Sequence, residues 1–309
     1  MQNRRIEILM ATYNGAPYIR EQLDSILAQT DCRWRLTVSD DGSTDGTDAI
    51  VDAYVRQYPE RMRRVHAGGR FGCARDHFFW LMRQCDADWM LFSDQDDVFY
   101  PRKVQALTEA MRAAEERLGA QTPLLVFSDQ TVVDAQLRTI SPSLMRYQRQ
   151  YSAAFDYRSI LLQNVVTGGA MAINRALAQW GAQCIRPQET IMHDWWLAAV
   201  AARFGHIVYL DEALGAYRQH ESNSVGAKQV DSLGYVARML RDPQRIRASI
   251  GCKKRQAGVF RDTFRERLTD GDRAFLQAFC ASRSGARFYL RYRRQIHGMK
   301  RLAGFMLWG

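Results

Sequence analysis

The stretch Trp89-Met90-Leu91-Phe92-Ser93-Asp94-Gln95-Asp96-Asp97 joins a short apolar run to three carboxylates within four residues. An apolar run of this length that ends in polar residues is typical of a buried strand. Three ionised carboxylates so close together repel one another, and a bound cation relieves the repulsion. Oxygen ligands suit Mg²⁺ or Mn²⁺, which commonly also bind substrate phosphates. The alternative is an acidic surface turn that begins the following helix.

The segments around this stretch alternate between strand and helix patterns. We expect strands where short apolar runs end in polar turns, at residues 6–11, 36–38, 89–93 and 124–127. We expect helices that open at Pro17, at 43–45, near 74 and near 101, the last two ending near 84 and 118. This alternation predicts an α/β fold with a mostly parallel central sheet and helices on both faces.

Polar turns follow three of the expected strands, at Thr12–Asn14, at Asp40-Asp41 and at Asp94–Asp97. In sheets of this kind ligands collect at the carboxyl ends of the strands, so we expect the three turns to converge on one edge. A carboxylate at Asp41 suits a nucleotide base or ribose. The alternative for this acid is capping of the next helix, which Ser43–Asp45 already supply.

The second half of the chain carries His193-Asp194-Trp195-Trp196 before an apolar helix. We interpret Asp194 as a general base, because apolar surroundings raise the pKa of a carboxylate towards useful values. Trp195 and Trp196 would enclose an acceptor sugar. The alternative is that Asp194 caps the helix. His220 is a candidate metal ligand beside the acids, although a single histidine is more often structural.

Charge divides the chain into two parts. Residues 1–220 carry a net charge of −2 and residues 221–309 a net charge of +12. Residues 282–309 mix Arg and Lys with aromatic and aliphatic residues, which is typical of a helix at a membrane interface. We expect an anionic membrane surface as a partner of 223–309. The alternatives are a helical tail packed on the rest of the chain and a nucleic-acid-binding tail, and we expect no nucleic acid because no recognised binding motif is present.

Composition limits the class of protein further. With 309 residues, 47% hydrophobic and 25% charged, the chain is long enough for one large domain or two smaller ones and is not intrinsically disordered. It has no run suited to a membrane-spanning helix, no apolar N-terminal signal and no CxxC among its six cysteines. These features predict a cytoplasmic protein with reduced thiols, and attachment to the cytoplasmic face of the inner membrane is a further hypothesis.

Five motifs together resemble the inverting family 2 glycosyltransferases, and in particular their bacterial rhamnosyltransferase-like subgroup. In chain order they are Ala11–Gly15, Asp40–Asp45, Asp94–Asp97, His193–Trp196 and Tyr217–His220. The resemblance spans about residues 5–225 and implies a GT-A fold. It divides the chain into a catalytic domain at 1–222, with a nucleotide-binding half to about 120 and an acceptor-binding half at 121–222, and a basic helical region at 223–309.

The resemblance also implies roles for individual residues. Asp194 would be the catalytic base. Asp96 and His220 would bind a divalent cofactor, Mn²⁺ or Mg²⁺. Contacts to the nucleotide-sugar would come from Thr12, Tyr13, Asn14, Asp41, Arg75, Asp94, Gly168, Gly169 and Arg218. The acceptor site would include Asp97, Trp195 and Trp196.

The function that follows is transfer of a sugar with inversion in bacterial surface polysaccharide synthesis, including O-antigen. The subgroup favours L-rhamnose from dTDP-L-rhamnose, with a UDP-hexose as the alternative donor. The acceptor would be a saccharide or a saccharide linked to a lipid diphosphate. A nucleotidyltransferase is the rival enzyme class, but Ala11–Ala16 lacks the glycine-rich, basic phosphate loop that such enzymes carry.

Overall fold

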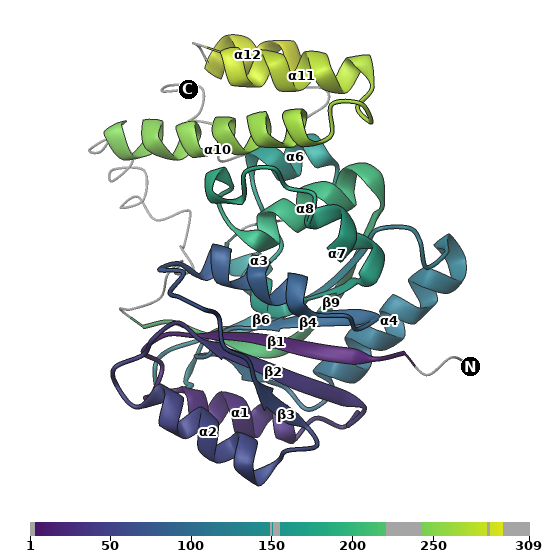
Figure 1. Cartoon of the computed structure of the whole chain (residues 1–309). Coiled ribbons are helices and arrows are strands. Elements are labelled where there is room, and N and C mark those ends of the chain that lie inside the picture. The colour runs from purple at the N-terminus through teal and green to yellow at the C-terminus, as the bar shows by residue number, and fades with distance from the viewer. Residues whose placement is uncertain (1–3, 149, 151–154, 221–242, 283–284, 293–309) are drawn as a thin grey trace.

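The computed structural model describes residues 4–148, 150, 155–220, 243–282 and 285–292, and a nine-stranded sheet runs through its centre (Figure 1). The strands are β1 (Ile6–Thr12), β2 (Trp34–Asp40), β3 (Met62–Arg64), β4 (Trp89–Ser93), β5 (Val98–Phe99), β6 (Leu124–Val133), β7 (Thr139–Ser141), β8 (Met171–Asn174) and β9 (His206–Arg218). Their spatial order is β3-β2-β1-β4-β8-β6-β9-β5, with β7 paired to β6.

The first half of the sheet is parallel, as the alternating pattern predicts. β1 lies between β2 and β4, and Ile8 is aligned with both Leu36 and Leu91. Side chains on both faces of β1 are buried: Ile8 belongs to one core cluster and Leu9 to the other. A strand covered on both faces reads as a continuous apolar run, which is why β1 and β4 are visible in the sequence.

Helices cover both faces of this sheet (Figure 1). They are α1 (Ile19–Leu27), α2 (Thr47–Gln57), α3 (Ala74–Gln84), α4 (Lys103–Leu118), α5 (Leu144–Tyr147), α6 (Tyr157–Leu162), α7 (Arg175–Gly181) and α8 (His193–Phe204). The expected starts of two helices are wrong. α1 begins at Ile19 rather than Pro17, and α2 follows Gly46, whose φ of 92° only glycine adopts readily.

The second half of the sheet is mixed. β8 is antiparallel to both β4 and β6, whereas β6 and β9 run parallel to each other. The short strand β5 pairs antiparallel with β9, through Val98 and Ala216. This last pairing brings the chain that follows Asp97 beside the chain that precedes His220, so the topology places two distant motifs together.

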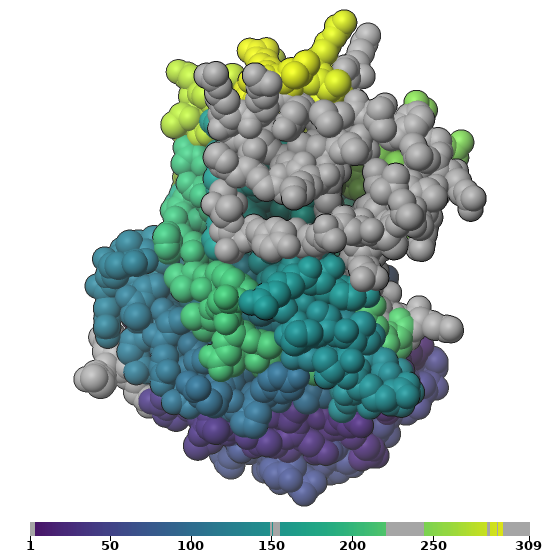
Figure 2. All heavy atoms as spheres, turned by 180° about the vertical axis from the view of Figure 1, so that it is seen from behind, coloured from purple at the N-terminus to yellow at the C-terminus, as the bar shows by residue number. Residues whose placement is uncertain are grey.

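Helices α10 (Pro243–Thr263), α11 (Asp270–Ala281) and α12 (Gly285–Tyr292) lie against the α6–α8 side of the domain (Figure 1). Phe260 and Phe264 of α10 pack on Trp196 of α8, with ring centroids 5.6 and 5.8 Å apart. These side chains belong to one hydrophobic core. Viewed from behind, the N-terminal residues lie at one end of the molecule and the C-terminal helices at the other (Figure 2).

The described helices of the basic region therefore pack on the domain, as one of the two alternatives predicted. Residues 221–242 and 293–309, which include many of the basic and aromatic residues of this region, lie outside the described residues. Within the described part of the chain, no helix combines the length and the apolar character that a bilayer crossing requires. All six cysteines are free thiols.

Candidate active site

Hydrogen bonds join the turns that follow β1, β2 and β4. The Tyr13 amide donates to Gln95 Oε1, and Gln95 Nε2 donates back to the Tyr13 carbonyl, each at 2.9 Å. The Asn14 amide donates to Ser43 Oγ at 2.8 Å. Gly15 leaves room for the amide of Gln95, because an added Cβ would lie 2.3 Å from Gln95 Oε1. The predicted convergence of the three turns is confirmed.

The two acids after β2 organise loops. Asp40 accepts hydrogen bonds from Thr12 Oγ1 at 2.7 Å and from the Ser43 amide at 2.8 Å. Asp41 accepts from the backbone amides of Phe71 and Gly72, at 2.5 and 2.8 Å, and is 6% exposed. The carboxylate of Asp41 thus holds the 71–72 turn at the sheet edge, and its contact with a nucleotide stays a prediction.

Two residues predicted to contact the donor, Tyr13 and Arg75, have different surroundings. Tyr13 is 47% exposed, and the guanidinium of Arg70 lies 5.0 Å from its ring centroid. Arg70 also donates to the Asp41 carbonyl at 2.9 Å. An exposed ring beside a cation is suited to stacking on a base. Arg75, by contrast, is bound to Asp76 at 2.8 Å and to the Thr190 carbonyl at 3.0 Å, so its contact with a donor stays a prediction.

The acids after β4 form the electrostatic centre of the site. Burial and the neighbouring Asp97 raise the pKa of Asp94 well above its ordinary range. Burial, followed by repulsion from Asp96, raises the pKa of Asp97 to about 7. Asp97 is 2% exposed and accepts a hydrogen bond from the Arg218 amide at 3.0 Å. This carboxylate therefore lies inside the protein, and its place in the acceptor site stays a prediction.

A lysine that the sequence analysis missed lies beside these acids. Lys103, the first residue of α4, is 1% exposed, and its Nζ donates to the Gly169 carbonyl at 2.5 Å. Its ammonium also lies 3.6 Å from the Phe99 ring centroid. Burial lowers the pKa of Lys103 to about 7, against the attraction of Asp97 and Asp94. The sequence signal is its position: a cation at a helix N-terminus opposes the helix dipole and needs another reason to be there.

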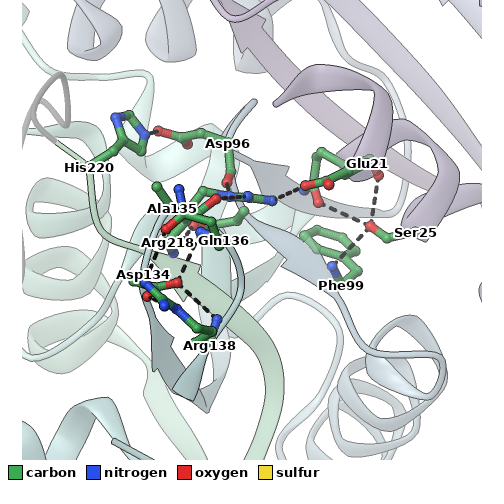
Figure 3. A network of polar contacts seen from close by, with 12 residues as sticks. Glu21, Ser25, Asp96, Phe99, Asp134, Ala135, Gln136, Arg138, Arg218 and His220 are labelled. Atoms are coloured by element: carbon green, nitrogen blue, oxygen red, sulfur yellow. Dashed lines mark hydrogen bonds and ion pairs between the residues drawn. The ribbon is translucent and has the colours of Figure 1, made fainter. Parts of the chain in front are cut away.

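Asp96 and His220 meet although they come from opposite ends of the domain (Figure 3). His220 Nε2 lies 2.8 Å from Asp96 Oδ2, and the side chains are 8% and 17% exposed. Tyr18 stacks on the imidazole, with ring centroids 4.5 Å apart. The part of the chain that the structure describes holds no group of three or more His, Cys, Asp or Glu arranged for a metal. A carboxylate and an imidazole are nonetheless a suitable pair for an ion that takes its remaining ligands from phosphates and water.

Arg218 supports this corner of the site from within the protein (Figure 3). Its side chain is 2% exposed and donates to the carbonyls of Asp96 and Ala135, each at 2.7 Å, and to the carboxylate of Glu21. Its guanidinium also lies over the Tyr18 ring, 4.8 Å from the centroid. Protein groups thus engage the guanidinium of Arg218, and its contact with the nucleotide-sugar stays a prediction.

Asp194 lies in the first turn of α8 and faces the acids after β4. Its Oδ2 accepts from the Gly168 amide at 3.1 Å and its Oδ1 from the Trp195 amide at 2.5 Å. Burial raises the pKa of Asp194 to about 7. The charge of Asp194 acts on Asp94. Asp194 does not cap α8, whose N-cap is Met192. A carboxylate that titrates near neutral pH is suited to proton transfer.

Gly168 and Gly169 separate this base from the acids. A Cβ on Gly169 would lie 3.0 Å from Asp94 Oδ2 and 3.1 Å from Asp97 Oδ2. A Cβ on Gly168 would lie 3.1 Å from His193 Nε2. Their small size therefore lets carboxylates and an imidazole approach the backbone, a use the sequence analysis did not anticipate. Contact of either glycine with a donor stays a prediction.

The aromatic neighbours of Asp194 have different environments. Trp196 is fully buried, and its indole donates to the Gly181 carbonyl at 3.0 Å. This ring forms part of the core, and its contact with an acceptor stays a prediction. Trp195 is partly exposed, and its indole donates to the Ile160 carbonyl at 2.5 Å. An acceptor contact of Trp195 stays a prediction.

His193, which sequence reasoning left without a role, packs between Phe78 and Phe92. The ring centroids lie 4.3 and 5.1 Å from the imidazole. Both ring nitrogens are buried without a hydrogen-bond partner, and burial lowers the pKa of His193 to about 3. The imidazole is therefore neutral at physiological pH and fills the space beneath Gly168.

The geometry joins acids at strand ends, a carboxylate and imidazole pair, and a separate carboxylate with a pKa near 7. The family model for glycosyl transferase family 2 matches residues 7–181, more than half of the chain. This chain belongs to glycosyl transferase family 2. Family membership decides the enzyme class in favour of a glycosyltransferase over a nucleotidyltransferase or a nucleic-acid-binding protein.

Two other glycosyltransferases are similar to this chain in sequence. The chain is 30% identical over 230 residues to the dTDP-rhamnosyl transferase RfbG of Shigella flexneri, covering 71% of this chain and 74% of that protein. It is also 26% identical over 135 residues to the putative glycosyltransferase EpsE of Bacillus subtilis, covering 43% of this chain and 48% of that protein.

Solved structures share the GT-A fold of this chain. TarS of Staphylococcus aureus, residues 1–349 in complex with UDP, aligns with a TM-score of 0.56 at 14% identity over 97% of this chain and 74% of that one. The mannosyltransferase PcManGT of Pyrobaculum calidifontis, in complex with GDP-Man and Mn²⁺, aligns with a TM-score of 0.52 at 16% identity over 99% of this chain and 87% of that one. At these identities the likeness shows the fold alone.

Proposed function

We propose that this family 2 enzyme transfers L-rhamnose from dTDP-L-rhamnose to a saccharide, free or linked to a lipid diphosphate, with inversion. The donor rests on the similarity to a dTDP-rhamnosyl transferase over most of both chains. The reaction rests on the position of Asp194: its Oδ2 accepts a hydrogen bond from the Gly168 amide at 3.1 Å, and the next residue, Gly169, adjoins the carboxylates of Asp94 and Asp97. Burial also raises the pKa of Asp194 to about 7. A UDP-hexose is the alternative donor. The setting would be synthesis of a bacterial surface polysaccharide such as O-antigen.

Asp194 acts as the general base. Its carboxylate takes the proton of the acceptor hydroxyl while the hydroxyl oxygen forms a bond to the anomeric carbon of the donor. The bond from that carbon to the diphosphate oxygen breaks at the same time, and the nucleoside diphosphate leaves with the electron pair. One displacement inverts the anomeric centre and needs no covalent intermediate. General base catalysis of this kind contributes ~10²–10⁴-fold in rate.

Asp96 and His220 would hold the divalent cation. Their 2.8 Å contact places an oxygen and a nitrogen donor at one point on the site's edge. Mn²⁺ or Mg²⁺ bound there supplies positive charge to the departing diphosphate. Arg218 and Tyr18 hold the pair in place: the guanidinium donates to the Asp96 carbonyl, and the phenol ring stacks on the imidazole.

Residues 223–309 would bring the enzyme to its acceptor on the cytoplasmic face of the inner membrane. The net charge of +12 in residues 221–309 attracts anionic lipid at about 1 kcal/mol per basic residue near the surface. On α12, Arg287, Leu290 and Arg291 are exposed. Phe288 and Tyr292 point into the core. An exposed leucine between two arginines is suited to the boundary between headgroups and acyl chains.

A panel of nucleotide-sugars tests the proposed donor. We expect dTDP-L-rhamnose with Mn²⁺ to raise the melting temperature more than UDP-glucose, UDP-GlcNAc or GDP-mannose, because a ligand that binds only the folded state stabilises it. Turnover in the presence of a saccharide acceptor should release dTDP and no pyrophosphate. Stabilisation and turnover only with a UDP-hexose would replace the donor and leave the enzyme class intact.

A further inference from the structure

Two hydrogen bonds and the backbone between them connect the buried Lys103 to the proposed base. Lys103 Nζ donates to the carbonyl of Gly169, and the amide of the adjacent Gly168 donates to Asp194 Oδ2 at 3.1 Å. The two glycines belong to one short 3₁₀ turn, Gly168–Ala170, which follows Thr167 and leads into β8. The same turn therefore has an ammonium on one side and the carboxylate of Asp194 on the other.

The surroundings of Lys103 leave its ammonium little freedom. The Phe99 ring lies under it at 3.6 Å, and an added Cβ at Gly215 of β9 would stand 3.3 Å from Nζ. The charges of Asp94 and Asp97 attract it from the acid side. A buried ammonium held this way keeps a fixed position, because moving it would leave both the cation and the Gly169 carbonyl without partners.

Asp194 depends on the turn for its orientation. Its two oxygens accept hydrogen bonds from the backbone, one from Gly168 and one from the amide of Trp195 in its own helix. The Gly168 bond is the one that comes from outside α8. His193 fills the space beneath Gly168, and the missing side chain of Gly168 leaves room for it. A shift of the turn would thus change the direction of the carboxylate.

We propose that Lys103 is a positioning residue for catalysis, which fixes the Gly168–Ala170 turn and through it the orientation of Asp194. This role rests on the proposed function of Asp194 as base. It differs from a role in donor binding, since Lys103 is 1% exposed and does not reach the site surface. It also differs from a purely structural role, because its effect passes through one hydrogen bond to the reacting carboxylate.

Lys103→Met tests the proposal, because methionine keeps the length of the side chain and removes the ammonium. We expect kcat to fall at least 30-fold while the Kd for dTDP, measured by calorimetry with Mn²⁺, stays within threefold. Lys254→Met is the matched control: Lys254 also donates to a backbone carbonyl, that of Ser282 in the C-terminal helices. We expect its kcat to stay within twofold of wild type.

Gly168→Ala covers the case in which Lys103→Met does not fold. Its Cβ would lie 3.1 Å from His193 Nε2, so the turn or the imidazole must shift, and its three nearest neighbours do not include Asp94 or Asp97. We expect the same loss of kcat with unchanged dTDP binding. A kcat within threefold of wild type in the folded variant, or a parallel loss of dTDP affinity, would overturn the proposal.

A double-mutant cycle separates this inference from the proposed function. If Lys103 acts through Asp194, Lys103→Met should cost less than threefold in the residual rate of Asp194→Asn, since the base it positions is gone. A full 30-fold cost in that background would overturn the inference and leave Asp194 as base. Full activity of Asp194→Asn alone would instead overturn the proposed function.

Discussion

The imidazole of His220 and the carboxylate of Asp96 lie 2.8 Å apart, although 124 residues separate them in the sequence. The pairing of β5 with β9 brings them together, because these strands carry Val98, just after Asp97, and Ala216, just before Arg218. In the proposed function these two side chains would hold a divalent cation that also binds phosphate. It is the geometric basis of the proposed metal dependence.

Removal of the cation should stop transfer. We expect EDTA to lower turnover at least 100-fold, and Mn²⁺ or Mg²⁺ to restore it, because the departing diphosphate needs positive charge. Asp96→Ala and His220→Ala should remain slow at any metal concentration. His206→Ala is the control, since this histidine is exposed at the start of β9. Unchanged wild-type turnover in EDTA would contradict the metal site.

The proposed base should appear in the pH profile. Asp194 must be ionised to accept a proton, and burial raises its pKa to about 7. We expect kcat to rise about tenfold per pH unit below 7 and to level off above it. Asp194→Asn should lower kcat by ~10²–10⁴-fold above pH 7, remove the rise with pH, and leave dTDP binding within threefold.

The control for that variant is Asp86→Asn. Asp86 carries the same functional group but lies just before β4, at the end opposite Asp94, where it pairs with Arg5 on the surface. We expect its pH profile to match that of the wild type. A flat wild-type profile between pH 5 and 8 would count against Asp194 as the base.

Asp272 should anchor the C-terminal helices. It is 4% exposed and accepts from Tyr157 Oη at 2.5 Å and from Arg203 Nε at 2.7 Å, and it completes the capping box of α11 with Thr269. We expect Asp272→Ala to lower the free energy of unfolding by about 1–3 kcal/mol, because Tyr157 and the partly buried Arg203 lose their charged hydrogen-bond acceptor. Chemical denaturation measures this.

The same group predicts a pH dependence of stability. Hydrogen bonds and ion pairs lower the folded-state pKa of Asp272 to about 2 against the opposing effect of burial. Its contribution is therefore fully present above the unfolded pKa near 4 and is lost as the pH falls towards 2. Asp270→Ala is the control, since Asp270 is 99% exposed. Equal losses in the two variants would contradict the anchoring role.

The basic region should bind anionic lipid. We expect the full chain to sediment with phosphatidylglycerol vesicles at low salt, to be released at high salt, and to ignore phosphatidylcholine vesicles. Arg287→Glu with Arg291→Glu should weaken binding, because both arginines are exposed on α12. The control is Arg35→Glu with Arg56→Glu, which makes the same charge change outside the basic region, on β2 and α2. No sedimentation at either salt concentration would remove the membrane hypothesis.

Local patterns in the sequence predicted the parallel half of the fold. β1, β4 and α3 lie where apolar runs and helical spacing placed them. β8 was missed, because four residues, Met171–Asn174, carry no readable period. Its place between β4 and β6 is decided by tertiary packing, which local propensity does not encode.

The candidate site, like the fold, could be predicted from the sequence only in part. The acids after β2 and β4 were predicted because the carboxyl ends of parallel strands meet at one edge. The burial of Asp97, Arg218 and Trp196 could not be predicted, since it depends on which elements cover them. Lys103 was missed because one lysine in a helix reads as a solvated residue until its neighbours are known.

The stereochemistry of the product tests the central claim most directly. The wild-type enzyme is incubated with Mn²⁺, dTDP-L-rhamnose and a saccharide acceptor, and the product is examined by NMR. We predict one dTDP released for each rhamnose transferred, with the anomeric configuration opposite to that of the donor. Retained configuration, release of pyrophosphate, or no transfer from any nucleotide-sugar would contradict a single displacement assisted by Asp194.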